Sequence, residues 1–264
     1  MANIRVIPNV DESEVAALQR YFASRASCDR QSESYISPGG GLALALTYEG
    51  ELRFGPAFFS AEIKTRKQGQ NGEILSKLRF RKFLSPGCCG QKFDYWAGDP
   101  WSGDEKHLAL VEVKTSSRAK SKALIFNLHS RNWSLLREFE GILAHGMWSQ
   151  SNQYYLYKDF RNWYRYCVVT EKNDIVFQGA SFPRHCYFVG KEGLILLMED
   201  SYKLISPDSL STLSLMPFEE EEIKANRYSL YDPINGRVFV GVNPTFPTAG
   251  MHVRCEKWKA IVVD

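Results

Sequence analysis

The sequence predicts an α+β or α/β fold, with a mixed central sheet, flanking helices and extra β structure in the C-terminal half. Three patterns lead to this expectation: apolar residues at helical spacing near the start, strand-like runs through the middle, and short aromatic runs divided by polar turns after residue 150. The 264 residues, 44% hydrophobic and 24% charged, are typical of a globular chain with one large domain or two small ones.

Residues 11–26 are expected to form the first helix, because their apolar residues recur at helical intervals. Asp11 fits the N-cap position and Glu14 the capping-box position. Two strands are expected next, at 42–48 and 52–63, around a hairpin turn at Glu49-Gly50.

The middle of the chain gives mixed signals. Residues 74–84 fit either a strand or a short helix, and 91–98 and 107–114 read as strands separated by a polar loop. A second helix is expected within 129–148, where five apolar residues form a helical stripe: Trp133, Leu136, Phe139, Leu143 and Met147.

The C-terminal half is expected to be mainly sheet. Its segment Tyr154–Tyr166 interleaves aromatic rings with basic residues, which fits a base-stacking surface or, as the favoured alternative, a sheet with a buried aromatic face. We find no internal repeat. The predicted division is a core over residues 1–205 and a C-terminal β extension over 206–264, packed on the same domain.

Charge and cysteine usage narrow the class of protein. The net charge is only +3, but basic residues gather in the first half, which suits a polyanion site or, equally, a set of solvated faces. No run reaches the ~20 apolar residues of a membrane span, and the start lacks the apolar core of a signal peptide. We therefore expect no membrane partner. The six cysteines are scattered, which indicates reduced thiols and a cytoplasmic compartment.

The tripeptide Glu-x-Lys occurs at residues 62–64, 112–114 and 222–224, so its letters alone decide nothing. The middle copy has the best context, because the preceding strand-like run carries Asp94. Residues two apart on a strand share a face, so Glu112 and Lys114 are expected to project together, and in a hairpin Asp94 comes alongside Glu112. The third copy, within an acidic run, is expected to be a solvated face.

This arrangement predicts a magnesium site. The carboxylates of Asp94 and Glu112 and the carbonyl of Val113 are oxygen ligands that Mg²⁺ prefers, and Lys114 would orient a metal-bound water. Glu73 is a candidate fourth member if its segment is helical, with Glu14 as the alternative. Six basic residues are expected to grip nucleic-acid phosphates: Arg118, Lys120, Lys122, Arg79, Arg81 and Lys82.

The residues Asp94 and Glu112-Val113-Lys114 resemble the PD-(D/E)xK nuclease superfamily, although Phe93 stands where that pattern usually has proline. The resemblance implies a restriction-endonuclease-like core and a magnesium-dependent phosphodiesterase. The chain length matches that of type II restriction endonucleases, which implies DNA rather than RNA as partner and a possible homodimer. A narrower resemblance, through "GQKFD" and "VEVKTS", is to DXO-like RNA decapping nucleases.

Two other interpretations stay open. Glu112 and Lys114 also fit a salt-bridged surface pair at the end of an edge strand, where a lysine discourages sheet-to-sheet pairing. The chain as a whole also fits a non-catalytic nucleic-acid or protein interaction module that uses its basic half and its aromatic segment.

Overall fold

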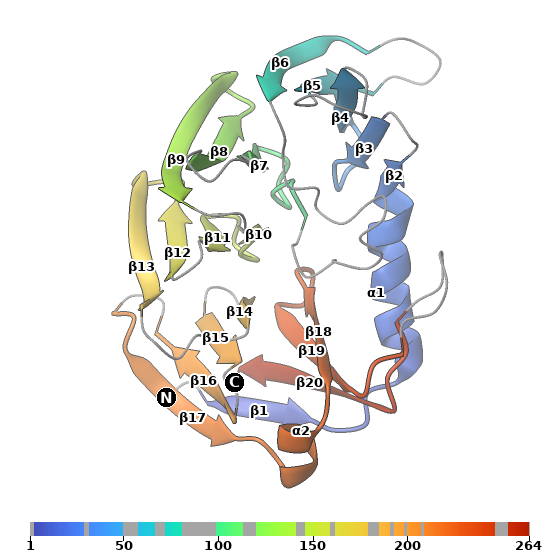
Figure 1. Ribbon diagram of the computed structural model, residues 1–264, viewed down its shortest axis with the longest axis vertical. Helices are drawn as coiled ribbons and strands as arrows, with labels where there is room; N and C mark the ends of the chain where they lie inside the picture. The colour runs from blue at the N-terminus through green and yellow to red at the C-terminus, as the bar shows by residue number, and fades with distance from the viewer. Residues whose placement is uncertain are drawn as a thin grey trace. The chain divides into compact units, whose positions relative to one another are not determined.

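The computed structural model describes thirteen stretches of the chain: residues 3–28, 32–49, 58–66, 72–80, 99–112, 120–140, 146–158, 162–178, 185–190, 193–197, 200–206, 209–245 and 253–263. Within them lie twenty strands in five sheets and only two helices (Figure 1). Every pairing whose register these residues define runs antiparallel. The expected α+β or α/β fold, with a mixed central sheet and flanking helices, is therefore wrong.

The chain divides into two compact units, the first comprising residues 1–20, 147–157 and 161–264 and the second residues 21–146 and 158–160. Two sheets belong to the second unit: β2 (Ala26–Cys28), β3 (Ser32–Ile36), β4 (Leu42–Glu49), β5 (Phe58–Thr65) and β6 (Ile74–Phe80) form one, and β7 (His107–Glu112), β8 (Lys120–Asn127) and β9 (Asn132–Glu140) form the other.

Three four-stranded sheets make up most of the first unit. They are β10 (Gly146–Trp148), β11 (Tyr154–Lys158), β12 (Asn162–Cys167) and β13 (Lys172–Gln178); β14 (His185–Val189), β15 (Gly193–Leu197), β16 (Ser201–Ile205) and β17 (Thr212–Pro217); and β1 (Ile4–Ile7), β20 (Lys257–Val263), β19 (Arg237–Val242) and β18 (Arg227–Asp232). The boundary predicted at residue 205/206 falls between β16 and β17, which pair within one sheet.

The last of these sheets, called the closing sheet here, joins the two ends of the chain. In Figure 1, β1 runs beside β20, and the register pairs Ile4 with Val263 and Ile7 with Ala260. Helix α1 (Glu12–Arg25) follows β1 and is tied to the same sheet, because Glu14 accepts a 2.9 Å hydrogen bond from Arg237. The closing sheet therefore depends on contacts between residues about as far apart in sequence as the chain allows.

The start of α1 follows the predicted chemistry in part. Asp11 accepts a 2.9 Å hydrogen bond from the backbone N–H of Ser13, as an N-cap residue does, and the helix ends within one residue of the expected position. Glu14 does not complete a capping box, since its carboxylate is ion-paired with Arg237.

The second unit holds a buried charged group of its own. Arg25, near the end of α1, pairs with Asp99 and donates to the carbonyl of Ile36 at 2.9 and 2.6 Å. Asp99 also accepts from the N–H of Trp101, whose indole donates to the carbonyl of Tyr35 at 2.9 Å. Burial raises the pKa of Asp99, and the Arg25 guanidinium opposes that rise. These bonds hold the segment before β7 against β3.

Three hairpin turns repeat one pattern, each beginning with a serine whose N–H donates to the carbonyl five residues on and whose hydroxyl accepts from that residue's N–H. The serines are Ser37, Ser102 and Ser149. The third residue after each has positive φ: 77° at Gly40, 58° at Glu105 and 61° at Asn152. The chain therefore contains a structural repeat that we did not find in the sequence, because the spacing between the serines is unequal and the intervening strands differ.

The predicted helix within 129–148 is wrong, since β9 and β10 occupy most of this segment. The reason is a β-bulge: Ala123 pairs with Arg137 but Leu124 pairs with Leu135, so Leu136 is an extra residue on β9. Leu136 is buried and Leu135 is exposed. The bulge converts the two-residue period of a strand into a local spacing of three, which imitates a helix. The ambiguous segment 74–84 contains strand β6.

Candidate ligand pocket

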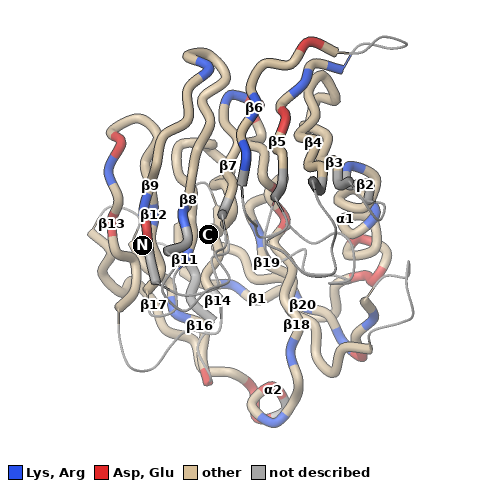
Figure 2. Tube along the Cα trace, turned by 45° about the horizontal axis from the view of Figure 1, so that its top comes forward, with Lys and Arg blue, Asp and Glu red and all other residues tan. Residues whose placement is uncertain are grey.

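A pocket of about 490 Å³ opens beside the closing sheet, within the first unit. Its walls come from the end of β1, from the short helix α2 (Glu220–Lys224), and from the facing ends of β19 and β20. Figure 2 shows that α2 carries both acidic and basic positions. The lining residues are Val6, Pro8, Asn9, Glu219, Glu222, Lys224, Ala225, Val242, Asn243, Glu256, Lys257, Trp258 and Lys259.

The base of the pocket is a buried ion pair. The Lys259 ammonium lies 2.6 Å from Oε2 of Glu222, and the two side chains are 12% and 3% exposed. Glu222 also accepts a 2.5 Å hydrogen bond from the hydroxyl of Tyr202 and a 3.0 Å bond from the N–H of Glu219. Both carboxylate oxygens are therefore engaged, which is what a buried charge requires.

The ionisation of Glu222 follows from these contacts. Burial raises the pKa of its carboxyl, but the hydrogen bonds from Lys259 and Tyr202 outweigh burial and leave the pKa below its ordinary value of 4.5. Burial, together with the bond to Glu222, raises the pKa of Tyr202. At neutral pH the base of the pocket is thus a carboxylate, held between an ammonium and a neutral phenol.

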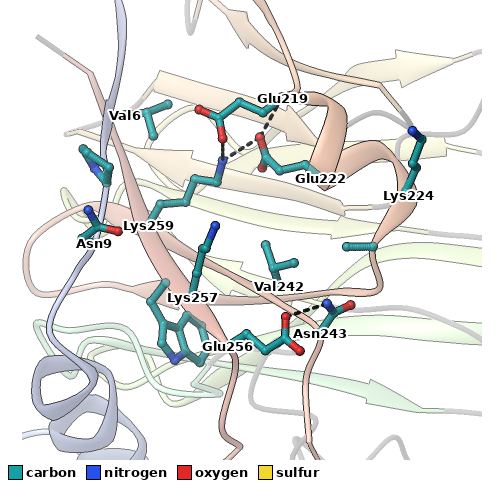
Figure 3. Close-up of a pocket in the computed structure, with 13 residues that line it drawn as sticks. Val6, Asn9, Glu219, Glu222, Lys224, Val242, Asn243, Glu256, Lys257 and Lys259 are labelled. Atoms are coloured by element: carbon teal, nitrogen blue, oxygen red, sulfur yellow. Dashed lines mark hydrogen bonds and ion pairs between the residues drawn. The ribbon is translucent and has the colours of Figure 1, made fainter.

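Strand β20 supplies the charged wall. Lys257 and Lys259 are two residues apart on it and so share a face, and in Figure 3 both ammonium groups extend into the same space. In Figure 3 the amide of Asn9 lies to one side of this space, whereas the carboxylate of Glu256 points away from the two ammonium groups, toward Asn243. The carboxylate of Glu256 is held by Asn243, whose Nδ2 donates to it at 2.8 Å.

Helix α2 forms the opposite wall. Its N-cap is Glu219, whose side chain and that of Glu222 form a capping box, so the first turn is fixed in place. Lys224 lies apart from the two β20 lysines in Figure 3, and its ammonium is ion-paired with Glu220 at 2.5 Å. The acidic run that was expected to be solvated therefore places one of its glutamates, Glu222, in the interior.

The residues predicted to bind magnesium and catalyse hydrolysis are only partly placed. Asp94, Val113 and Lys114 lie outside the described residues. Glu112 ends β7, and the register places Lys122 of β8 opposite it. In the described part of the chain, no three or more His, Cys, Asp or Glu side chains gather into a metal-binding group.

Three other predicted site residues are paired with residues outside the predicted site. Glu73 precedes strand β6 rather than lying on a helix, and it is exposed beside Arg131, 3.5 Å away. Glu14 is ion-paired with Arg237. Lys122 pairs with Glu138 at 3.0 Å.

For the remaining basic residues, contact with nucleic-acid phosphates stays a prediction. Arg79 is exposed on β6, and Lys120 begins β8. Arg81, Lys82 and Arg118 lie outside the described residues.

The described parts of the aromatic segment, 154–158 and 162–166, are strands with buried aromatic side chains, as the sheet interpretation predicted. Tyr155, Tyr157 and Tyr164 are buried and stack in sequence, with ring centroids 6.0 and 5.3 Å apart. Arg165 is also buried, with its guanidinium 3.0 Å from Asp174. These rings are not available to stack on bases.

Sequence reasoning missed the pocket residues, although one signal for them is present. The last strand reads Lys-Trp-Lys before an apolar run, and charges at alternate positions of a strand project to the same face. The partners Glu222 and Tyr202 carry no comparable signal, because they meet Lys259 only through the tertiary fold.

Comparisons with known proteins define the fold. No family model and no curated sequence relative matches the chain. The β-propeller domain of the Trilobed protease from Pyrococcus furiosus aligns over 90% of this chain and 69% of its own, with 9% identity and a TM-score of 0.51. A eukaryotic initiation factor aligns over 83% of this chain and 49% of its own, with 12% identity and a TM-score of 0.51.

TolB from Acinetobacter baumannii is also similar, with 11% identity over 86% of this chain and a TM-score of 0.43. The chain spans about half the length of that protein and of the initiation factor. The likeness to the Pyrococcus domain shows a β-propeller fold, in which small antiparallel sheets are the blades.

This fold overturns the resemblance drawn from the Glu112 tripeptide. A PD-(D/E)xK nuclease has a mixed sheet with flanking helices, whereas this chain consists of small antiparallel sheets like those of β-propellers. The interpretation as a nuclease, restriction endonuclease or decapping enzyme is therefore wrong. It failed because it relied on about 30 residues whose pattern recurs by chance. As a separate finding, no helix in the described stretches has the length and apolarity to cross a membrane.

Proposed function

We propose that the chain is a ligand-binding module of β-propeller fold, which takes a small polar molecule in the pocket beside α2. The observation that carries this proposal is a pocket of about 490 Å³ whose base is a buried ion pair, in which both carboxylate oxygens of Glu222 accept hydrogen bonds. Ligand pockets usually measure about 300–1,000 Å³ and combine apolar walls with a few placed polar groups. Val6, Pro8 and Val242 provide the apolar wall in this case.

The pocket is preorganised, which favours binding. Glu222 and Lys259 fix each other, Tyr202 fixes Glu222, and the capping box fixes the first turn of α2. Side chains that are already held lose little rotamer freedom when a ligand arrives, so more of the interaction energy appears as affinity. Because the pocket draws on residues from both ends of the chain, a bound ligand would also stabilise the closing sheet.

A screen of small polar molecules by ligand-observed NMR, using the full 264-residue chain, tests the proposal. Ala225→Trp would fill the pocket from the end of α2, where the backbone is extended (φ −91°, ψ 153°) and accepts a large side chain. Leu215→Trp is the matched control, on an exposed position of β17. We expect ligands that bind the parent and Leu215→Trp but not Ala225→Trp.

Thermal unfolding supplies an independent readout, because a ligand at 100 times its Kd stabilises the folded state by about 2.7 kcal/mol. The proposal is wrong if every ligand found binds Ala225→Trp as tightly as it binds the parent. It is also wrong if no molecule in the screen binds the parent.

A further inference from the structure

We infer that the pocket selects an uncharged ligand with several hydroxyl groups, of about the size of a monosaccharide. This inference rests on the proposed ligand-binding function and specifies its ligand. It follows from how the polar groups of the lining are used, because the charged groups are already engaged whereas a neutral amide is available. Six of the lining residues are charged, three lysines and three glutamates, so the lining as a whole carries no net charge.

All three lysines of the lining are engaged within the protein. Lys259 is bound to Glu222 at 2.6 Å, and Lys224 is paired with Glu220 at 2.5 Å. Lys257 also makes an interaction of its own. An anion that enters the pocket would therefore compete with partners that these lysines already have.

The three glutamates of the lining are engaged in the same way. Glu222 accepts hydrogen bonds at both carboxylate oxygens, and Glu219 lies 3.9 Å from the ammonium of Lys259. The carboxylate of Glu256 accepts a 2.8 Å bond from Asn243 and points toward it in Figure 3, away from the two ammonium groups on β20. A cation in the pocket would therefore meet carboxylates that already have hydrogen-bond donors or a counter-charge.

A charged ligand is poorly matched to such a lining. Groups of both signs lie close together in it, so each attraction to the ligand would be offset by repulsion from a neighbouring group of the ligand's own sign. Leaving water also costs an ion far more than it costs a hydroxyl group. A hydroxyl both donates and accepts, so it can bond to an ammonium and to a carboxylate without separating the two.

Asn9 supplies a neutral contact for such a ligand. Its side chain makes no hydrogen bond to another described residue, and its amide lies to one side of the pocket space in Figure 3. The backbone here is fixed to β20, because the N–H of Val10 donates to the carbonyl of Trp258 at 3.0 Å. An amide offers an acceptor oxygen and two N–H donors, which match two adjacent hydroxyl groups, one donating and one accepting.

The apolar wall of the pocket suits the rest of a sugar ring. Such a ring carries its hydroxyl groups around the rim and C–H groups on its two faces. Val6, Pro8 and Val242 would contact a face of the ring, while the amide of Asn9 and the charged pairs contact the rim. The lining thus provides both kinds of surface that an uncharged sugar requires.

NMR titration with matched sugars tests this inference on the full 264-residue chain. The probes are glucose, galactose and mannose, each with its uronate and its 6-amino-6-deoxy analogue, which place a negative or a positive charge at the same end of the ring. We expect a neutral sugar to bind at least about 10-fold more tightly than both of its charged analogues, which equals about 1.4 kcal/mol. A charged analogue that binds as tightly as its neutral parent would overturn the inference, as would a failure of all the neutral sugars to bind.

Two substitutions test the contact with Asn9, whose backbone is left-handed (φ 55°). Asn9→Asp keeps the size of the side chain but removes the N–H donors, and it should weaken the neutral sugar by about 5-fold, as expected for one hydrogen bond. Asn9→Gly keeps the backbone conformation, removes the whole amide and should weaken binding at least as much. Asn152→Asp is the matched control, because it makes the same change at a left-handed asparagine (φ 61°) outside the lining. The inference falls if both Asn9 variants bind the sugar as tightly as Asn152→Asp does.

The two proposals fail in different ways. If none of the sugars binds, but other ligands are excluded by Ala225→Trp, the pocket is a binding site and its assignment to uncharged sugars is wrong. If a sugar binds equally to the parent and to Ala225→Trp, it binds elsewhere and both proposals fail for it.

Discussion

The tripeptide Glu-Ile-Lys occurs twice in the described chain. The isoleucine is the buried residue in one copy, and the glutamate is the buried residue in the other. In β5, Ile63 is fully buried, while Glu62 pairs with Lys64 at 2.6 Å and with Lys77 at 2.8 Å near the surface. In α2, Glu222 is 2% exposed and Ile223 is 52% exposed. The same three letters therefore give a surface ion pair in one place and the base of a pocket in the other.

The difference comes from the partners that the fold supplies. Glu62 meets lysines on its own strand and the neighbouring strand, so its pairing is local. Glu222 meets Lys259 and Tyr202 from two other strands, and only the tertiary fold brings them together. Burial then makes the second pair far more important for stability, because a buried charge that loses its partner cannot turn to water.

The largest expected effect is the loss of that partner. Glu222→Gln leaves the Lys259 ammonium, which is 12% exposed, with only the more distant Glu219 at 3.9 Å as counter-charge, and we expect the free energy of unfolding to fall by about 3 kcal/mol. Glu62→Gln should cost less than about 1 kcal/mol, because its lysines are exposed to solvent. Urea unfolding of both variants measures the difference.

A second substitution provides the control for this comparison. Lys259→Met, combined with Glu222→Gln, removes the stranded charge and should recover part of the lost stability. Equal costs for Glu222→Gln and Glu62→Gln, with no recovery in the double variant, would show that Glu222 is not a buried charge.

Acid should weaken the same contact. The folded-state pKa of Glu222 lies below its ordinary value of 4.5, so the unfolded chain binds a proton more readily. The contribution of Glu222 to stability is therefore complete above pH 4.5 and is lost as the pH falls through the folded pKa. We expect the stability gap between the parent and Glu222→Gln to narrow over that range, as measured by urea unfolding at successive pH values. A gap that widens in acid would reverse the assigned direction of the pKa shift.

In the acid experiment, added salt distinguishes the contribution of Glu222 to stability from that of Glu62. The pKa of Glu62 is also lowered, by its bonds to Lys64 and Lys77, but that group of charges lies near solvent. At 1 M salt the screening length is about 3 Å, so the contribution of Glu62 should largely disappear while that of Glu222 persists.

The same contrast shows what the sequence can predict. Local signals gave α1 with its Asp11 cap, because the cap depends on neighbouring residues. They gave two strands near β4 and β5, but the hairpin turn predicted at Glu49-Gly50 is wrong, since the register pairs Glu49 with Phe58 and β5 begins at Phe58 rather than at residue 52. They did not give β9, where a bulge at Leu136 imitates helical spacing. Nor did they give the closing sheet, because strand pairing between residues 4–7 and 257–263 leaves no trace in either segment alone.

The site was missed for a related reason. Glu222 lies in an acidic run that is expected to be solvated, and no property of the run shows that Lys259 and Tyr202 will surround it. The predicted site centred instead on Glu112, which lies in a tripeptide of the same Glu-x-Lys pattern. Glu222 belongs to the pocket because it is buried against Lys259 and Tyr202, not because it is part of a Glu-x-Lys tripeptide.

The smallest expected effect concerns the two isoleucines, Ile63 and Ile223, which differ in burial between the two copies of the tripeptide. Ile63→Val removes one methylene from a fully buried side chain and should cost about 0.5–1.5 kcal/mol, because the cavity left behind has no solvent to fill it. Ile223→Val is the same chemical change at a residue that is 52% exposed, so it should alter stability by less than about 0.5 kcal/mol. Urea unfolding of the two variants, measured side by side, compares the two copies of the tripeptide without touching any charge. If Ile223→Val costs as much as Ile63→Val, then α2 packs its isoleucine inward, and the assignment of Glu222 to the base of the pocket is wrong.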